Sequence, residues 1–300
     1  MDYEFAKSII IPSLKIIRSD QKIKRFYFLP GLISVIFLSV LLVYQVVYTY
    51  VVLLGKQDAI LELILQLFHS QYLTQIIIAG SILVIFHILL NPIFEGALIR
   101  YIDNKSMDWN ASRSDSIGFW IVRFYPLFEF NNTFNMFKFI SIINGYLFTL
   151  RFLWLEYMTS LSLFFIVVFL FSIILNILIA YARYEIVLEN KWVFEAIWIS
   201  SQIALLNIKT TLRLYVLMFF MNIKVIVNFF IFLIFPILWA FIAGLVTSQT
   251  FAAIAFIILG VFFVFLILVL GYMTAVLDIF TTSIWYYAYK QGKQKMEKNT

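Results

Sequence analysis

Eight polar residues lie within long apolar runs of this chain or at their ends, where a polar side chain is costly. A charged side chain at the centre of a bilayer costs about 2.5 kcal/mol or more, so such residues are candidates for function. At membrane depth an amide, imidazole or carboxylate can line a polar pathway or hydrogen-bond a neighbouring helix. These candidates are His87, Asn91, Glu95, Lys138, Asn176, Lys224, Asn228 and Asp278.

Depth divides the candidates into two groups. Glu95 lies about 30 Å into its run at 1.5 Å per residue, and Asp278 is equally late in its own, so both reach the predicted cytoplasmic boundary. Lys138 and Lys224 directly precede the crossings 139–157 and 225–246 at that boundary and can extend their ammonium groups to water. We interpret these four as interfacial residues. The functional alternative is that the carboxylates pair with the lysines and line a cytoplasmic mouth.

The deeper group consists of His87 and three asparagines. Asparagines in membrane helices commonly hydrogen-bond neighbouring helices, at about 0.6 kcal/mol each, which favours a packing role. A lone histidine without an acidic partner in its own helix favours the same interpretation. Transport is the alternative, and it predicts a water-accessible cavity lined by Asn91, Asn176, His87 and Glu95.

Enzyme chemistry finds little support in the sequence. There are two histidines and no cysteine, with no H-E-x-x-H spacing, phosphate-cradling glycine loop or nucleophile elbow. No nucleophile and base share one depth. We therefore expect neither catalytic residues nor a metal or other cofactor.

Composition places most of the chain in lipid. Hydrophobic residues make up 63% and charged residues 13% of the 300 positions, whereas soluble domains are about one half apolar and one quarter charged. Runs of roughly 20 apolar residues can cross about 30 Å of hydrocarbon as a helix. The sequence predicts an all-α, polytopic membrane protein, one membrane domain over 1–300. About six crossings are expected, at 26–54, 75–98, 139–157, 161–182, 225–246 and 251–278.

Basic residues follow the even-numbered crossings and fill both ends of the chain, including the tail 289–300. Only Lys56 and Arg151 remain for the opposite face. Such a bias predicts that both termini are cytoplasmic. It makes anionic headgroups the expected partner of the net charge of +6, rather than nucleic acid, at about 1 kcal/mol per basic residue. A lysine- and isoleucine-rich chain without cysteine suits a bacterial cytoplasmic membrane.

Amphipathic segments connect the crossings on the basic side. Residues 1–25, 114–135 and 192–213 keep apolar residues at helical spacing among charges, which is typical of helices that lie in the interface. In 192–213, Phe194 and Trp198 are expected to face lipid, and Glu195 and Ser200 are expected to face water or lipid headgroups. A joining elbow is favoured over a lipid-sensing device.

An internal repeat is suggested by two stretches, ALIRYIDNK and ARYEIVLENK. Each unit would contain an inward helix, an elbow and an outward helix, so the repeats are parallel. The first and last crossings would form a third copy, which requires them to be adjacent. The pairs are Asn91 with Asn176 and Ala97 with Ala182 at an offset of 85, then Asp103 with Glu189, Asn104 with Asn190, Lys105 with Lys191, Arg123 with Lys209 and Lys138 with Lys224 at 86.

The stretches NPIFEGALIRYIDNK and EAIWISSQIALLNIKTTLRLYVLMF, with the six-crossing plan, resemble the bacterial YciC proteins and the membrane domain of some glycerophosphodiester phosphodiesterases. The basic segment FAKSIIIPSLKIIRSDQKIKRFYFLPGLI more weakly resembles the CysZ sulfate permeases. The first resemblance implies a helical inner-membrane fold and a link to envelope upkeep.

Three functional classes follow from these patterns. A structural or accessory membrane protein in envelope homeostasis, with a membrane-protein partner or a second copy, is the first expectation. A permease or channel for a small solute or lipid is the alternative, and an enzyme ranks last.

Overall fold

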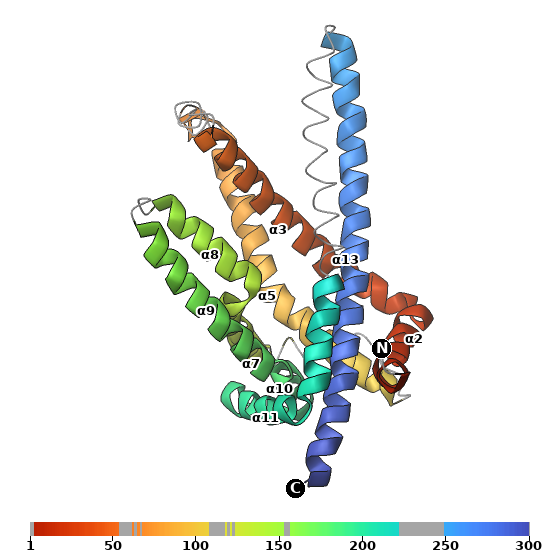
Figure 1. Cartoon of the computed structure of the whole chain (residues 1–300). Coiled ribbons are helices and arrows are strands. Elements are labelled where there is room, and N and C mark those ends of the chain that lie inside the picture. Colours follow the sequence, from red (N-terminus) through yellow and green to blue (C-terminus); the bar gives the residue numbers. More distant parts are fainter. Residues whose placement is uncertain are drawn as a thin grey trace. The chain divides into compact units, whose positions relative to one another are not determined.

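The computed structural model describes residues 3–53, 68–107, 124–152, 157–221 and 249–299, together with the isolated positions 62, 65, 66, 118 and 121. Every regular element within these ranges is a helix (Figure 1), which agrees with the all-α prediction. The predicted crossing 225–246, with Lys224 and Asn228, lies outside the described residues.

The chain divides into two compact units. Unit 1 contains Met1–Ser19, Pro92–Met221 and Phe280–Thr300, and unit 2 contains Asp20–Asn91 and Asn222–Ile279. The described helices of the chain are α1 (Tyr3–Phe5), a π-helical turn (Ala6–Ile10), α2 (Ile11–Ser19), α3 (Gln21–Leu53), α5 (Leu73–Ser106), α7 (Tyr125–Phe134), the 3-10 turn η2 (Asn135–Phe137), α8 (Phe139–Phe152), α9 (Met158–Leu178), α10 (Ala182–Glu189), α11 (Val193–Leu206), a helix at Ile208–Met221 and α13 (Gln249–Asn299).

Three helical stretches in the described part of the chain are long and apolar enough to cross a membrane. They are Leu73–Ser106, Met158–Glu189 and Gly260–Lys298, with mean hydropathies of 2.4, 3.0 and 2.5 in their most apolar windows. The bent pair Val193–Leu206 and Ile208–Met221 makes a fourth if it counts as one span. These stretches contain the predicted crossings 75–98 and 161–182 and most of 251–278.

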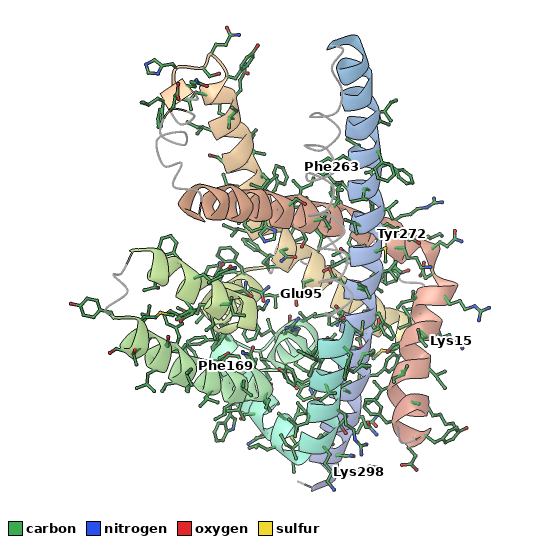
Figure 2. All side chains as sticks on the ribbon, turned by 45° about the horizontal axis from the view of Figure 1, so that its top comes forward. Lys15, Glu95, Phe169, Phe263, Tyr272 and Lys298 are labelled. Atoms are coloured by element: carbon green, nitrogen blue, oxygen red, sulfur yellow. The ribbon has the colours of Figure 1, made fainter. Side chains whose placement is uncertain are left out.

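Apolar side chains cover the outside of these helices instead of filling a core. On α9, Leu163, Phe164, Val167 and Leu170 are all more than half exposed, and only 17% of the most apolar window of Met158–Glu189 is buried. Figure 2 shows the side chains along α9 and α13, with Phe169 and Tyr272 labelled. Water-soluble proteins do not expose contiguous apolar surface of this extent, so the pattern is typical of helices surrounded by lipid.

The predicted crossing 139–157 is described as a helix over most of its length. Helix α8 covers Phe139–Phe152, and residues 153–156 lie outside the described residues. Helix α8 packs against α9 (Figure 1), and the hydroxyls of Tyr146 and Ser162 lie 2.8 Å apart across that contact. The contact between α8 and α9 therefore includes polar groups.

Tyrosines form the centre of unit 1. Tyr181, Tyr184, Tyr286 and Tyr289 are among the largest fully buried side chains. The hydroxyl of Tyr181 lies 2.9 Å from that of Thr211. The Tyr184 hydroxyl donates to the Thr282 carbonyl. A buried hydroxyl without a partner is costly, so these bonds allow aromatic rings to fill the interior.

The elbow predicted over 192–213 is two helices rather than one. Helix α11 ends at Leu206, Asn207 interrupts the helical structure, and the axis of the next helix lies at 97° to that of α11. Phe194, Trp198 and Leu205 are exposed, as expected of residues that face lipid. Ser200, in contrast, is fully buried.

The prediction that Ser200 faces water is thus wrong. Its hydroxyl donates to the Leu178 carbonyl and accepts from the Tyr181 amide. A small side chain there lets α11 approach the end of α9, and its two bonds satisfy backbone groups at a helix break.

Unit 2 contains a close contact between α3 and α13. A Cβ added at Gly31 would lie 2.6 Å from the Gly271 carbonyl oxygen and 3.0 Å from the Ala275 amide nitrogen. Only a residue without a side chain permits this approach of two helix backbones. The contact places α3 beside α13, which is the adjacency that a third copy of the predicted repeat requires of the first and last crossings.

The two proposed repeats differ in local backbone. Helix α5 continues through Pro92 and Asn104 to Ser106, whereas the matching stretch breaks between α9 and α10 and ends at Asn190 in a left-handed conformation (φ 55°). The matched acidic residues Asp103 and Glu189 are alike in one respect, because each forms an ion pair with a lysine of α13. Asp103 binds Lys290 and Glu189 binds Lys293. The repeat itself remains a prediction.

Candidate functional site

A partly buried ion pair lies in unit 1. Glu95, in the second half of α5, accepts from Arg183 Nη1 through Oε1 at 2.6 Å and from Asn131 Nδ2 through Oε2 at 2.9 Å. Its side chain is only 14% exposed. Lys138 adds a further attractive Coulomb interaction. A carboxylate removed from water needs such partners, because an unpaired buried charge is strongly destabilising.

Three helices bring this pair together. Pro92, Gly96 and Ala97, on either side of Glu95, are buried, so this part of α5 packs against neighbouring segments. A break at Ile179–Tyr181 starts α10 at Ala182 and places Arg183 in its first turn. Helix α7 supplies Asn131.

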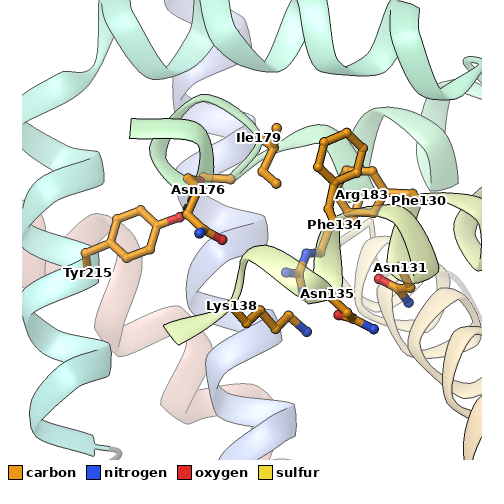
Figure 3. A pocket seen from close by; sticks show the side chains of 10 residues that line it. Phe130, Asn131, Phe134, Asn135, Lys138, Asn176, Ile179, Arg183 and Tyr215 are labelled. Carbon is orange, nitrogen blue, oxygen red and sulfur yellow. Dashed lines mark hydrogen bonds between the residues drawn. The ribbon is translucent and has the colours of Figure 1, made fainter. Parts of the chain in front are cut away.

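A cavity of about 40 Å³ adjoins Arg183. Figure 3 shows Arg183, Lys138 and Asn135 among the side chains that line it. A water needs roughly 10–15 Å³ of such space, so the cavity accommodates about three. Its lining consists of Phe130, Asn131, Phe134, Asn135, Lys138, Asn176, Ile179, Ala180, Arg183 and Tyr215.

Asn176 joins α9 to the segment before α8. Its Nδ2 donates to the carbonyls of Phe137 and Ser172, both at 2.8 Å. Its own carbonyl accepts from the Tyr215 hydroxyl. The amide nitrogen is therefore engaged in holding chain segments together at the cavity wall, which is the kind of contact that the packing interpretation expects of such asparagines.

Two further carboxylates of unit 1 are held by the end of α13. Asp103 accepts from the Tyr286 hydroxyl at 2.7 Å and lies 3.0 Å from Lys290 Nζ. Tyr286 also lies 2.7 Å from the Ser106 hydroxyl. The tyrosine and lysine are four residues apart, so they lie on one face of the helix.

The same arrangement recurs three residues later. Glu185 accepts from the Tyr289 hydroxyl at 2.8 Å and lies 3.4 Å from Lys293 Nζ. Lys293 also binds Glu189 at 2.6 Å. We call Tyr286 with Lys290, and Tyr289 with Lys293, the two Tyr–Lys pairs. Each pair neutralises one buried carboxylate, so α13 is fastened to α5 and to α10.

The described candidates are divided between the two units. Glu95, Lys138 and Asn176 lie at or beside the cavity of unit 1. His87 and Asn91 belong to unit 2. The imidazole of His87 stacks on Phe37 at 4.3 Å between ring centroids, and Asn91 is exposed. Asp278 is half-buried in unit 2.

Of the four residues that the transport alternative expects around a cavity, Asn176 lines the one beside Arg183, and Glu95 binds two residues of its wall. Glu95 accepts hydrogen bonds from Arg183 and Asn131, and Lys138 adds a Coulomb attraction. The alternative in which the boundary lysines pair with carboxylates stays a prediction.

Sequence reasoning missed Arg183, Asp103, Glu185 and the Tyr–Lys pairs as site residues. Arg183 was counted only as part of the cytoplasmic charge. The sequence contains one local signal. In the stretch YYAYKQGK, Tyr286 to Lys293, a tyrosine precedes a lysine by four residues twice, and this spacing places the two members of each pair on one face of a helix. No local pattern, however, indicates which carboxylates they contact.

In the ranges that the structure covers, no group of three or more histidine, aspartate or glutamate side chains is placed to hold a metal ion. The chain matches none of the family models, curated proteins or solved structures with which it was compared.

Proposed function

We propose that this chain is a multi-pass protein of the bacterial cytoplasmic membrane with a structural or accessory role in envelope homeostasis. The observation that carries the proposal is that the buried polar groups of unit 1 bind one another. Glu95, Asp103 and Glu185 each have a cationic partner and a neutral donor. Groups used in this way stabilise a packed interior rather than a path for solutes.

The orientation with both termini in the cytoplasm is part of the same proposal. It rests on the one-sided placement of lysine and arginine. The resemblance to the YciC proteins and the related membrane domain supports the envelope role. Six crossings, with 225–246 among them, complete the proposed topology.

A permease or channel for a small solute or lipid is the second candidate. The cavity beside Arg183 favours it, because Lys138 and three amides also line that space. A pathway would have to continue beyond a volume of about 40 Å³, which holds only about three waters.

Single-cysteine labelling separates the two candidates in this chain, which contains no native cysteine. We would replace Asn91, Asn176 or Asn228 by cysteine in turn and add a membrane-impermeant thiol reagent to each side of sealed vesicles. Lys7→Cys and Lys298→Cys report the cytoplasmic side, and His69→Cys the opposite side.

The structural role predicts that none of the three asparagine positions reacts from either side, while Lys7→Cys and Lys298→Cys react only from the cytoplasm. Reaction at the asparagine positions from both sides would instead indicate a continuous aqueous pathway and favour transport. Reaction of His69→Cys from the cytoplasmic side would contradict the topology.

A further inference from the structure

The charged side chains that line the cavity beside Arg183 are both cationic. Lys138 and Arg183 belong to its lining, which includes no carboxylate among the described residues, and Glu95 binds Arg183 from outside it. A lining of this kind is complementary to an anion.

Neutral donors surround the two cations. Asn131 and Asn135 extend their amides at the cavity wall (Figure 3). Helix α8 begins at Phe139, directly after Lys138, whose backbone is extended. The positive end of that helix therefore lies beside Lys138, and the free amide hydrogens of a first helical turn favour oxyanions.

The remaining wall is apolar. Phe130, Phe134, Ile179 and Ala180 line the same space. A site with a cationic, amide-rich side and an aromatic and aliphatic side suits a ligand that joins an oxyanion to a hydrocarbon. Its volume of about 40 Å³, equal to about three waters, is comparable with the oxygens of one phosphate group.

The depth of the two cations agrees with such a ligand. Lys138 opens a predicted run at the cytoplasmic boundary, and Arg183 directly follows the crossing 161–182. Lipid phosphates lie at this level of a bilayer, where basic side chains attract anionic headgroups.

We propose that Lys138 and Arg183, with the amide of Asn135, form a binding site for a phosphate group, and that the group belongs to the headgroup of a membrane phospholipid. Lys138 supplies one cation, Arg183 supplies a second that Glu95 holds in place, and the Phe130–Phe134 side of the cavity contacts the glycerol or the first part of the acyl chains. The lipid source depends on the membrane location proposed above. The phosphate site itself does not.

The test uses the full chain in detergent micelles, so that membrane orientation plays no part. Three probes are titrated: a short-chain phosphatidylglycerol, a diacylglycerol with the same chains but no phosphate, and inorganic phosphate. Binding is read as a rise in Tm and as a Kd from the titration, because a ligand that binds only the folded state stabilises it by mass action.

The decisive variant is Lys138→Gln, since Lys138 is exposed and its loss leaves the Glu95–Arg183 pair intact. Lys209→Gln is the matched control, because it removes the same charge from an exposed position outside the cavity. We expect phosphatidylglycerol to bind the unaltered chain and Lys209→Gln equally, and Lys138→Gln about tenfold more weakly. Lys138→Arg should restore most of the affinity.

Two results would overturn the proposal: equal affinities of Lys138→Gln and Lys209→Gln, or equal binding of diacylglycerol and phosphatidylglycerol. Lys138-dependent binding of inorganic phosphate at the affinity of the lipid supports the site and identifies free phosphate as its source. The Tm of each variant without ligand shows that it is folded. A failure here leaves the labelling result, and with it the proposed membrane role, untouched.

Discussion

Helices α9 and α10 follow one another within Met158–Glu189, yet they use their side chains in opposite ways. Helix α9 is the more apolar, and residues such as Phe164 and Val167 are about 60% exposed. Helix α10 contains an arginine and two glutamates, and its Tyr184 and Glu185 are both 1% exposed. In a water-soluble protein the apolar side chains of α9 would be buried and the polar side chains of α10 would be exposed.

The difference shows where each helix obtains its stability. In the proposed membrane location lipid surrounds α9, so its apolar surface is already in a favourable medium and contributes little to packing. Helix α10 is held by directed contacts, which include Arg183 with Glu95 and Glu185 with Tyr289. The packed core of unit 1 therefore lies at the polar ends of its helices rather than along their apolar middles.

We expect the largest effect from a charge placed on the apolar helix α9. Val167→Lys places a charge near the middle of the apolar helix, on an exposed position. Membrane insertion of α9 should become less favourable by about 3 kcal/mol. Protease protection of newly made chains in vesicles measures the inserted fraction, with Val167→Leu as control. If both variants insert equally, α9 does not cross the bilayer.

On the side of α10, Arg183→Ala leaves the Glu95 carboxylate without its ion-pair partner. Breaking a buried pair costs about 3–5 kcal/mol, and we expect about 2–3 kcal/mol because the arginine is partly exposed. The free energy of unfolding in a denaturing-detergent titration measures this loss.

The same titration on the double variant Arg183→Ala with Glu95→Gln supplies the control. It should recover part of the lost stability, because the unpaired charge is gone. A double variant that is no more stable than Arg183→Ala would show that the arginine acts through packing rather than through its charge.

Gly31→Ala tests the close contact between α3 and α13, which involves no polar side chain. The added methyl would meet the backbone of α13 at Gly271 and Ala275, and such overpacking costs about 2 kcal/mol. Gly80→Ala is the control, since nothing lies within 4 Å of the position of its added Cβ. Unfolding of both variants in micelles measures the difference. Equal stability would mean that α3 and α13 separate without cost.

Tyr289→Phe removes the hydroxyl that donates a hydrogen bond to Glu185, whose side chain is 1% exposed. A hydrogen bond to a charged group contributes about 1.5–3 kcal/mol, and we expect a loss near 1.5 kcal/mol because Lys293 remains. Tyr286→Phe should cost less, since Asp103 is 8% exposed and more easily hydrated. The difference in Tm between the two variants tests this order, and a reversed order would contradict it.

The smallest expected effect concerns Lys191, whose ion pair with Glu195 lies on the surface. The Glu195 carboxylate raises the pKa of the Lys191 ammonium. A raised pKa means that any stabilisation is present below the ordinary lysine pKa and is lost as the pH rises through the raised one. Solvent and salt screen such a pair. Lys191→Ala should therefore leave Tm unchanged at neutral pH within error, and a clear decrease would show that the pair is structural.

Composition and apolar runs were sufficient to predict an all-helical chain and three of its long apolar helices. The predicted 75–98 lies within α5, and 161–182 overlaps α9 and the start of α10. They were less informative where a helix breaks. The break at Asn207 interrupts an amphipathic pattern that continues on both sides, so periodicity alone predicts one helix.

The candidate site was predicted only in part, for a physical reason. Depth in an apolar run identified Glu95, Lys138 and Asn176, because unfavourable burial is a property of one residue and its neighbours in sequence. Partner choice depends on contacts between distant segments. Glu95 binds a residue 88 positions later, and the Tyr289–Glu185 bond spans 104, so neither was accessible to local spacing.

The Tyr–Lys pairs also impose an order on biosynthesis. Asp103 and Tyr286 are 183 residues apart in sequence, and a ribosome adds about 5–20 residues per second. Roughly 10 to 40 seconds therefore pass between their synthesis. Throughout that interval the carboxylate has neither its native hydroxyl donor nor its native ammonium partner, so unit 1 acquires its final packing only after the lipid-exposed helices that precede α13 have been made.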